Sequence, residues 1–212
     1  MNAEQDHPPL RIGDKVPLFT ARSTQGIVDL EEMLGRWIVL FAHPADFTPV
    51  CTSEFIALAK AADEFAAMDC ELIGISVDSL YSHLAWVRMI HEMAGVAVRF
   101  PIVEDPTMEV ARAYGMIGAD ARDAGSVRMT YFIDPQGVLR AQTCYPPTVG
   151  RSIPEMLRVL AALQRVETGD VLTPADWQPG GDLLRAPRES VDDALRSVDM
   201  AGWFYTPVKD RG

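Results

Sequence analysis

The sequence predicts an α/β fold in which helices flank a central mixed β-sheet, followed by an extended C-terminal arm. Up to about residue 165, apolar runs of strand length alternate with longer helix-like stretches, which is typical of a layered α/β domain. After about Thr168 the composition changes to proline, glycine and charged residues. We therefore expect one domain over residues 1–168 and a separate extension over residues 169–212.

Four segments of the first region have the composition of strands. Residues 37–43 (WIVLFAH) and 71–77 (ELIGISV) are almost continuously apolar and rich in β-branched residues, so they are expected to be central strands buried on both faces. Residues 127–133 and 138–143 are joined by Asp-Pro-Gln-Gly, a turn sequence that predicts a hairpin.

Helices are predicted between and after these strands. Residues 51–68, 79–93 and 107–114 favour helix by composition. A further helix is indicated by apolar residues that share one helical face: Ile153, Met156, Leu157, Leu160 and Leu163.

The extension offers only a short helical candidate at residues 190–198 and a strand-like end at residues 203–205. It has too little apolar material for a core of its own. Its aromatic residues are therefore expected to bury against another surface, either a second subunit or the chain's own first domain: Trp177, Trp203, Phe204 and Tyr205.

Charge and composition exclude several classes of protein. A hydrophobic content of 48% is enough for a buried core, so disorder is not expected. The 19 basic and 30 acidic residues give a net charge of −11, which disfavours nucleic acid and anionic membranes as partners. The first fifteen residues carry charges and a Pro-Pro pair rather than a signal peptide, and no apolar run reaches membrane-spanning length. We expect a cytoplasmic protein.

The three cysteines, Cys51, Cys70 and Cys144, are widely spaced. They fit neither a disulfide framework nor the paired ligands of a zinc site, so no metal is expected and their interest is as thiols.

Cys51 lies in the segment that carries chemistry, residues 43–54 (HPADFTPVCTSE), which leaves a buried strand and enters a helix at the cysteine. The first amides of a helix lack internal partners and carry partial positive charge, so this position favours a thiolate. Thr48 stands close enough for its hydroxyl to reach the sulfur or an oxygen beside it, and Pro44 and Pro49 stiffen the loop. Taken alone, the residues also allow a plainer interpretation, with Cys51 a small buried hydrophobe and Thr48 an ordinary N-cap.

Pro44, Thr48 and Cys51 reproduce the Pro-x-x-x-Thr/Ser-x-x-Cys signature of the peroxiredoxins. Typical two-cysteine enzymes have Val-Cys-Pro at this point, whereas here Thr52 follows the cysteine. The segment therefore more closely resembles the one-cysteine, peroxiredoxin-six subfamily of the AhpC/TSA family. The resemblance runs from residues 12–14 (IGD) to the tail. It implies a thioredoxin-like fold whose C-terminal arm embraces a second subunit in a homodimer, and such dimers can assemble into rings.

The resemblance also implies further site residues. Residues 126–135 (SVRMTYFIDP) look like the family strand that carries the active-site arginine, here Arg128, which would lie beside the thiolate and orient the peroxide. Glu54 would orient a pair of arginines, Arg128 and Arg151. The alternative for Glu54 and for Arg151 is a surface charge at the start of a helix. His43 would lie near the peroxide pocket, or else be a structural histidine.

His83 and His91 are assigned to the surface or to packing.

The implied activity is that of an antioxidant thiol peroxidase without a cofactor. The Cys51 thiolate would attack hydrogen peroxide or an organic hydroperoxide and become a sulfenic acid. An external thiol is the expected reductant, because Cys70 begins a predicted buried strand and is expected to be inert. Cys144 stays open as a resolving or mixed-disulfide partner.

Three other functions compete with this activity. Residues 34–38 read LGRWI where some subfamily members carry the Gly-x-Ser-x-Gly element of a phospholipase, so that activity is not expected. A non-enzymatic chaperone or redox-sensing scaffold remains open, because fold does not decide function. A disulfide reductase is disfavoured because Cys51 has no Cys-x-x-Cys partner.

Overall fold

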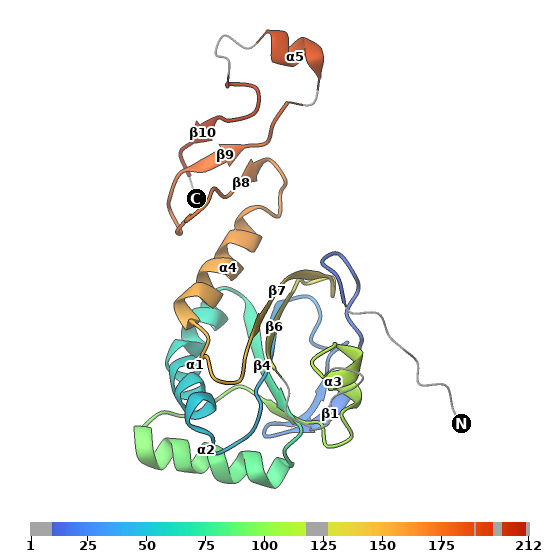
Figure 1. Ribbon diagram of the computed structural model, residues 1–212, viewed down its shortest axis with the longest axis vertical. Coiled ribbons are helices and arrows are strands. Elements are labelled where there is room, and N and C mark those ends of the chain that lie inside the picture. The colour runs from blue at the N-terminus through green and yellow to red at the C-terminus, as the bar shows by residue number, and fades with distance from the viewer. Residues whose placement is uncertain (1–9, 118–126, 189, 197–200, 211–212) are drawn as a thin grey trace, which may run out of the picture. The chain divides into compact units, whose positions relative to one another are not determined.

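The computed structural model describes residues 10–117, 127–188, 190–196 and 201–210 (Figure 1). The chain divides into two compact units, Met1–Ile153 and Pro154–Gly212. The division falls after the first residue of the last long helix, α4 (Ile153–Arg165), whereas the composition placed the boundary after this helix. In the described part of the chain, no helix combines the length and apolarity needed to cross a membrane.

The first unit contains a seven-stranded mixed sheet, so the predicted fold class is confirmed. The strands lie in the order β2-β1-β5-β4-β3-β6-β7, with β3 parallel to β4 and antiparallel to β6. Their bounds are β1 (Thr20–Ser23), β2 (Gly26–Asp29), β3 (Trp37–Ala42), β4 (Cys70–Ser76), β5 (Ile102–Glu104), β6 (Arg128–Ile133) and β7 (Leu139–Tyr145).

The four predicted strands correspond to β3, β4, β6 and β7, and every residue of β3 and β6 is buried. The other strands of this sheet were not predicted. β1 and β2 have four residues each and form an edge hairpin of mixed polarity, while β5 has only three residues. Such short segments carry too little periodicity to be distinguished from loops.

Helices cover both faces of this sheet (Figure 1). α1 (Pro49–Ala67) and α2 (Leu80–Ala94) lie on one face, and the short α3 (Glu109–Ala113) lies on the other. On the α1 face the ring centroids of Phe41 and Phe55 are 5.5 Å apart. Gly74 allows this close approach, since a Cβ atom there would lie 3.2 Å from the Phe55 ring.

The opposite face of the sheet holds an aliphatic and tyrosine core. It packs Leu40 and Tyr131 from the sheet against Tyr114, which follows α3. The two faces therefore carry different chemistry, and only the α1 face receives the segment that contains Cys51.

The second unit has a small core to which both α4 and the extension contribute. β8 (Val171–Leu172), β9 (Leu183–Arg185) and β10 (Pro207–Val208) form a three-stranded antiparallel sheet in the order β10-β9-β8. Trp177 is buried there with Val171 and Leu183, and two alanines of α4 pack against this cluster. Of the two surfaces expected to bury Trp177, the structure therefore shows the chain's own, because α4 lies within residues 1–168 and supplies apolar contacts.

The end of the chain differs from the prediction. The segment that contains Trp203 and Phe204 is a turn, in which the backbone amides of Phe204 and Tyr205 donate hydrogen bonds to the Ala201 carbonyl. The last strand begins only at Pro207. These two residues and Tyr205 are exposed. The short helix α5 spans Val191–Leu195, and the end of the predicted helix, residues 197–198, lies outside the described residues.

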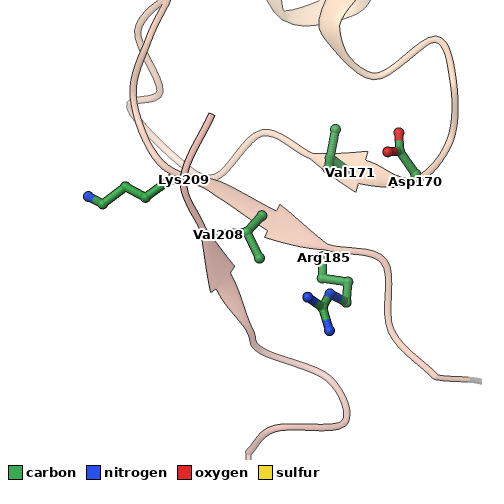
Figure 2. Close-up of a pocket in the computed structure, with 5 residues that line it drawn as sticks. All are labelled: Asp170, Val171, Arg185, Val208 and Lys209. Atoms are coloured by element: carbon green, nitrogen blue, oxygen red, sulfur yellow. The ribbon is translucent and has the colours of Figure 1, made fainter. Parts of the chain in front are cut away.

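A shallow hollow of about 640 Å³ also lies in this unit (Figure 2). Its lining residues are Asp170, Val171, Arg185, Val208 and Lys209. The charged side chains do not converge on it, since Lys209 pairs with Asp182 at 2.7 Å and Asp170 accepts from Thr168. We see no catalytic arrangement there.

Candidate active site

Cys51 lies in the first turn of α1. Thr48 is the N-cap residue with extended backbone angles, and Pro49 occupies the first helical position. The first intrahelical hydrogen bond runs from the Thr52 amide to the Thr48 carbonyl at 2.9 Å, so the Cys51 amide precedes the helical ladder. This places the sulfur of a fully buried cysteine at the positive end of a helix of 19 residues, where an anion is stabilised.

Arg128, the first residue of β6, reaches across to this sulfur. Its Nη1 donates to Cys51 Sγ at 3.3 Å and to Glu54 Oε2 at 2.7 Å, while Nη2 donates to the Pro147 carbonyl at 2.7 Å. The side chain is 2% exposed. A buried guanidinium held by three acceptors has a fixed position, so its charge is presented to the sulfur without rearrangement.

Glu54 joins Arg128 to a second arginine. Arg151 donates its backbone amide and Nε to Glu54 Oε1 at 2.7 and 2.9 Å, and its Nη2 to Oε2 at 2.8 Å. Its Nη1 donates to the Met129 carbonyl at 3.1 Å. The guanidinium also lies over the Phe41 ring, 5.2 Å from the centroid.

The charges of this cluster leave one positive charge unbalanced. Burial acts to raise the pKa of Glu54, but the hydrogen bonds and charge of Arg151, with the charge of Arg128, outweigh it and hold that pKa below its usual range. Glu54 is therefore ionised and neutralises one of the two buried guanidiniums. The Arg128 guanidinium also donates to the Cys51 sulfur, so a negative charge on that sulfur would make the set neutral.

The loop before the helix holds the other predicted residues. The Thr48 hydroxyl donates to the Ala45 carbonyl at 2.9 Å rather than to the sulfur, which leaves its oxygen lone pairs as acceptors. Pro44 is half-buried at the start of this loop. Phe47, between them, has a φ of 56° in the left-handed region and is exposed.

His43 belongs to a buried triad that the sequence did not predict. Its Nε2 lies 2.9 Å from Asp46 Oδ1, and His83 Nδ1 on α2 lies 2.8 Å from Asp46 Oδ2. Burial lowers the pKa of His43, against the opposing effect of Asp46, and the two histidines hold the pKa of Asp46 below its usual range although burial acts to raise it. Nothing in the spacing of His83 could have indicated this contact, because the residue is 37 positions from Asp46.

The other two histidines agree with their assignment to the surface or to packing. His83 is completely buried, so its placement at the surface is excluded and packing in the triad remains. His91 is exposed at the end of α2, where its Nδ1 lies 3.2 Å from the Val96 carbonyl.

The triad also has the composition of a metal site, with two imidazoles and a carboxylate whose candidate ligand atoms lie within 4.8 Å of one another. Such a donor set suits zinc. Each carboxylate oxygen already lies at hydrogen-bond distance from one imidazole nitrogen, however, and all three side chains are buried. We therefore interpret the triad as hydrogen-bonded.

The other two cysteines lie away from Cys51. Cys70 follows the far end of α1, and the helix from Cys51 to Ala67 is about 24 Å long at about 1.5 Å per residue. Burial raises the pKa of the Cys70 thiol to about 12, which agrees with an inert thiol.

Cys144 is exposed on β7 opposite Met129. Directly opposed side chains of an antiparallel pair share one face, and Arg128, the neighbour of Met129, points to the other. Since Arg128 contacts Cys51, Cys144 lies on the opposite face of the sheet.

Comparisons with known proteins agree with this geometry. The family model described as AhpC/TSA family matches residues 12–142. A peroxiredoxin of Aquifex aeolicus is 49% identical over 94% of this chain and 96% of its own length. A peroxiredoxin of Methanosarcina mazei is 44% identical over 94% of this chain and 97% of its own length.

Solved structures give the same result. A yeast mitochondrial 1-Cys peroxiredoxin matches with a TM-score of 0.85 and 38% identity, over 95% of this chain and all of that chain. A Plasmodium vivax 2-Cys peroxiredoxin matches with a TM-score of 0.77 and 33% identity, over 89% of this chain and all of that chain. The predicted thioredoxin-like fold is confirmed.

Proposed function

This chain belongs to the AhpC/TSA family and is a peroxiredoxin, a thiol peroxidase with an antioxidant function, and from that premise we propose that it works by a one-cysteine mechanism at Cys51. Its substrates would be hydrogen peroxide and organic hydroperoxides, and its reductant an external thiol. The observation that carries the proposal is the buried set of two guanidiniums and one carboxylate around the Cys51 sulfur.

The arrangement supports an in-line displacement. The Cys51 thiolate attacks one peroxide oxygen, the S–O bond forms as the O–O bond breaks, and the second oxygen leaves as hydroxide or alkoxide and takes up a proton from solvent. The attacked oxygen keeps its hydrogen and becomes part of a sulfenic acid. Arg128 and the Cys51 amide donate toward the developing negative charge.

Thr48 has a complementary part in this step. Because its hydroxyl donates to the Ala45 carbonyl, its oxygen accepts a hydrogen bond from the O–H of the attacked peroxide. Such an acceptor orients the peroxide with its O–O bond in line with the sulfur, which lowers the entropy cost of the attack.

The positions of the other thiols favour the one-cysteine mechanism. A disulfide needs Cα atoms within about 7 Å of each other. Cys70 lies beyond the other end of α1 and Cys144 on the other face of the sheet, so neither is placed to form one with Cys51 in the same subunit. The yeast structure concerns thiol resolution through glutathione and thioredoxin systems, and we propose a reductant of this thiol class here.

We also propose that the chain forms a homodimer in the cytoplasm, with rings of dimers as a further assembly. Trp203, Phe204 and Tyr205 are exposed in the second unit, which supports a subunit interface there. Analytical ultracentrifugation of the protein and of Phe204→Asp tests the dimer. A monomeric natural chain, or an unaltered dimer in the variant, would contradict it.

The direct test of the peroxidase mechanism is mass spectrometry after about one equivalent of hydrogen peroxide, with a sulfenic-acid trap. We expect the trap on Cys51 only, and turnover with a small thiol in a Cys70→Ser, Cys144→Ser variant at the natural rate. A disulfide between Cys51 and either other cysteine would show that a cysteine of the chain, rather than an external thiol, resolves the sulfenic acid. If Cys51 stayed unmodified, the scaffold function would have to replace catalysis.

A further inference from the structure

Asp46 fixes the loop of residues 43–48 by three hydrogen bonds. Its carboxylate accepts from the rings of His43 and His83, at 2.9 and 2.8 Å, and its amide donates to Asp78 Oδ2 at 2.8 Å. Two of these partners, His83 and Asp78, lie outside the loop. The loop is therefore anchored to the start of α2 and to the turn before it.

The loop needs such anchoring because its backbone is strained. Phe47, directly after Asp46, has a φ of 56°, a conformation that is unfavourable for a bulky side chain. Its side chain is exposed and contributes little packing. The bonds of Asp46 hold the segment that carries Pro44 and Thr48, and hence the oxygen of Thr48 that faces the peroxide in the proposed mechanism.

The Asp46 carboxylate, which bonds both rings, also determines the proton position on each of them. An ionised carboxylate only accepts, so a neutral His43 carries its proton on Nε2 and a neutral His83 carries its proton on Nδ1. The His43 ring is fixed further by Trp86, stacked at 5.2 Å, and by Phe55, 4.9 Å away and one helical turn beyond Cys51. The Nδ1 lone pair of His43 is thereby set in one direction.

His83 has a feature that packing alone does not explain. Its Nε2 is buried and has no hydrogen-bond partner among the described residues. An unsatisfied buried nitrogen destabilises the fold, whereas an apolar side chain of similar size would fill the space without that penalty. The imidazole is therefore retained for the atom that does form a bond, Nδ1, and that bond goes to Asp46.

We propose that His83 is a positioning residue of the peroxidase site, which holds Asp46 and, through it, the 43–48 loop and the His43 ring in the arrangement that peroxide meets at Cys51. The inference deepens the proposed function and rests on it. His83 itself touches neither the sulfur nor the substrate.

Three variants test the inference in the full-length protein. His83→Leu removes the donor, His83→Asn places an amide N–H where Nδ1–H stands, and Ile90→Ala disturbs buried packing of the same helix without touching the triad. The measurement is the second-order rate of Cys51 oxidation by hydrogen peroxide under conditions in which each variant is folded. We expect His83→Leu to be slower by about ten- to a hundredfold, and the other two to stay within about threefold of the natural chain.

A spectroscopic readout separates positioning from general destabilisation. Nitrogen-15 NMR of the imidazoles in the reduced natural protein should show the Nε2–H tautomer for His43 and the Nδ1–H tautomer for His83. His83→Asn should keep the His43 tautomer, while His83→Leu should produce a mixture. This readout does not depend on peroxidase activity and needs no variant for its first part.

The inference would be overturned if His83→Leu reacted at the natural rate or if Ile90→Ala lost as much rate as His83→Leu. It would also be overturned if His83→Asn did not restore the rate. An Nδ1–H tautomer of His43 in the natural protein would also overturn it, even if His83→Leu did not fold. Failure of the proposed function is distinct, because Cys51 of the natural protein would then not react with peroxide while the tautomers could still be as described.

Discussion

Arg151 binds Glu54 through three separate N–H groups, its backbone amide, Nε and Nη2, at 2.7, 2.9 and 2.8 Å. The bond from the backbone ties the segment that follows β7 to α1, while the two side-chain bonds form a bidentate pair with both carboxylate oxygens. Glu54 is therefore a structural centre of the active site as well as its counter-charge.

Glu54→Gln tests this double role through stability. The substitution keeps the shape of the side chain but leaves two buried guanidiniums without a negative charge, so we expect a loss of about 3 kcal/mol in the free energy of unfolding. Urea denaturation measures it. Glu155→Gln, which removes an exposed carboxylate paired with Arg158, is the matched control and should lose less than about 1 kcal/mol. Equal losses in the two variants would contradict the prediction.

Cys51→Ser should abolish peroxide reduction without unfolding the protein, because serine is nearly isosteric.

Arg128→Ala should slow the reaction of Cys51 with peroxide by about a hundredfold to a thousandfold, since it removes a preorganised donor from the sulfur. Stopped-flow kinetics with hydrogen peroxide gives both rates. Arg88→Ala, at an exposed arginine of α2, should retain the natural rate. A fully active Arg128→Ala would remove this arginine from the mechanism.

The acid limb of the stability profile should contain a contribution from Glu54. Its pKa is below the ordinary value of 4.5 in the folded protein, so below pH 4.5 the unfolded chain binds a proton that the folded chain does not. Stability from this group is thus complete above pH 4.5 and is lost as pH falls through the folded pKa. The pKa of Asp46 is likewise held below its ordinary value of 3.8, so the stability that this group contributes is lost as pH falls below 3.8.

The measurement for this prediction is the thermal unfolding midpoint between pH 7 and pH 3, compared with Glu54→Gln. We expect the natural protein to lose more stability than the variant below pH 4.5, so that the two curves converge. Parallel curves would mean that Glu54 titrates alike in the folded and unfolded states.

Metal removal should leave the peroxidase rate unchanged. The His43–Asp46–His83 triad is interpreted as hydrogen-bonded, so treatment with EDTA and addition of zinc should alter neither the rate of Cys51 oxidation nor the unfolding midpoint. A zinc-dependent rise of the midpoint that His83→Asn abolishes would show that the triad is a metal site.

The long buried strands and the cysteine helix could be predicted from the sequence because their signals are local. β3 is an uninterrupted apolar run, and Pro49 and Thr48 mark the start of α1. The short strands β1, β2 and β5 could not be predicted, since three or four residues carry too little periodicity, and the pairing of β1 with β5 joins segments distant in sequence. The choice between the two surfaces expected to bury Trp177 could not be made from the sequence either, because it depends on a tertiary contact with α4.

The candidate site was predictable where a motif carries it and unpredictable where only folding brings residues together. One short segment contains Cys51, Thr48 and Pro44. A family resemblance, rather than their own spacing, predicted Arg128, Glu54 and Arg151. Asp46 was part of the same segment, but its function depends on His83, which the chain brings to it from another helix. Buried pairs of this kind carry no periodic signal.

The exposure of Cys144, set against the complete burial of Cys51, predicts that the two thiols sort reagents by size in opposite ways. A bulky maleimide or aromatic disulfide should modify Cys144 first, whereas the smallest oxidant should act first on Cys51. A thiol count taken with a large chromogenic reagent would therefore report the surface cysteine and overlook the reactive one. Cys144 is thus an attachment point for a fluorophore that leaves the peroxide chemistry of the same molecule observable.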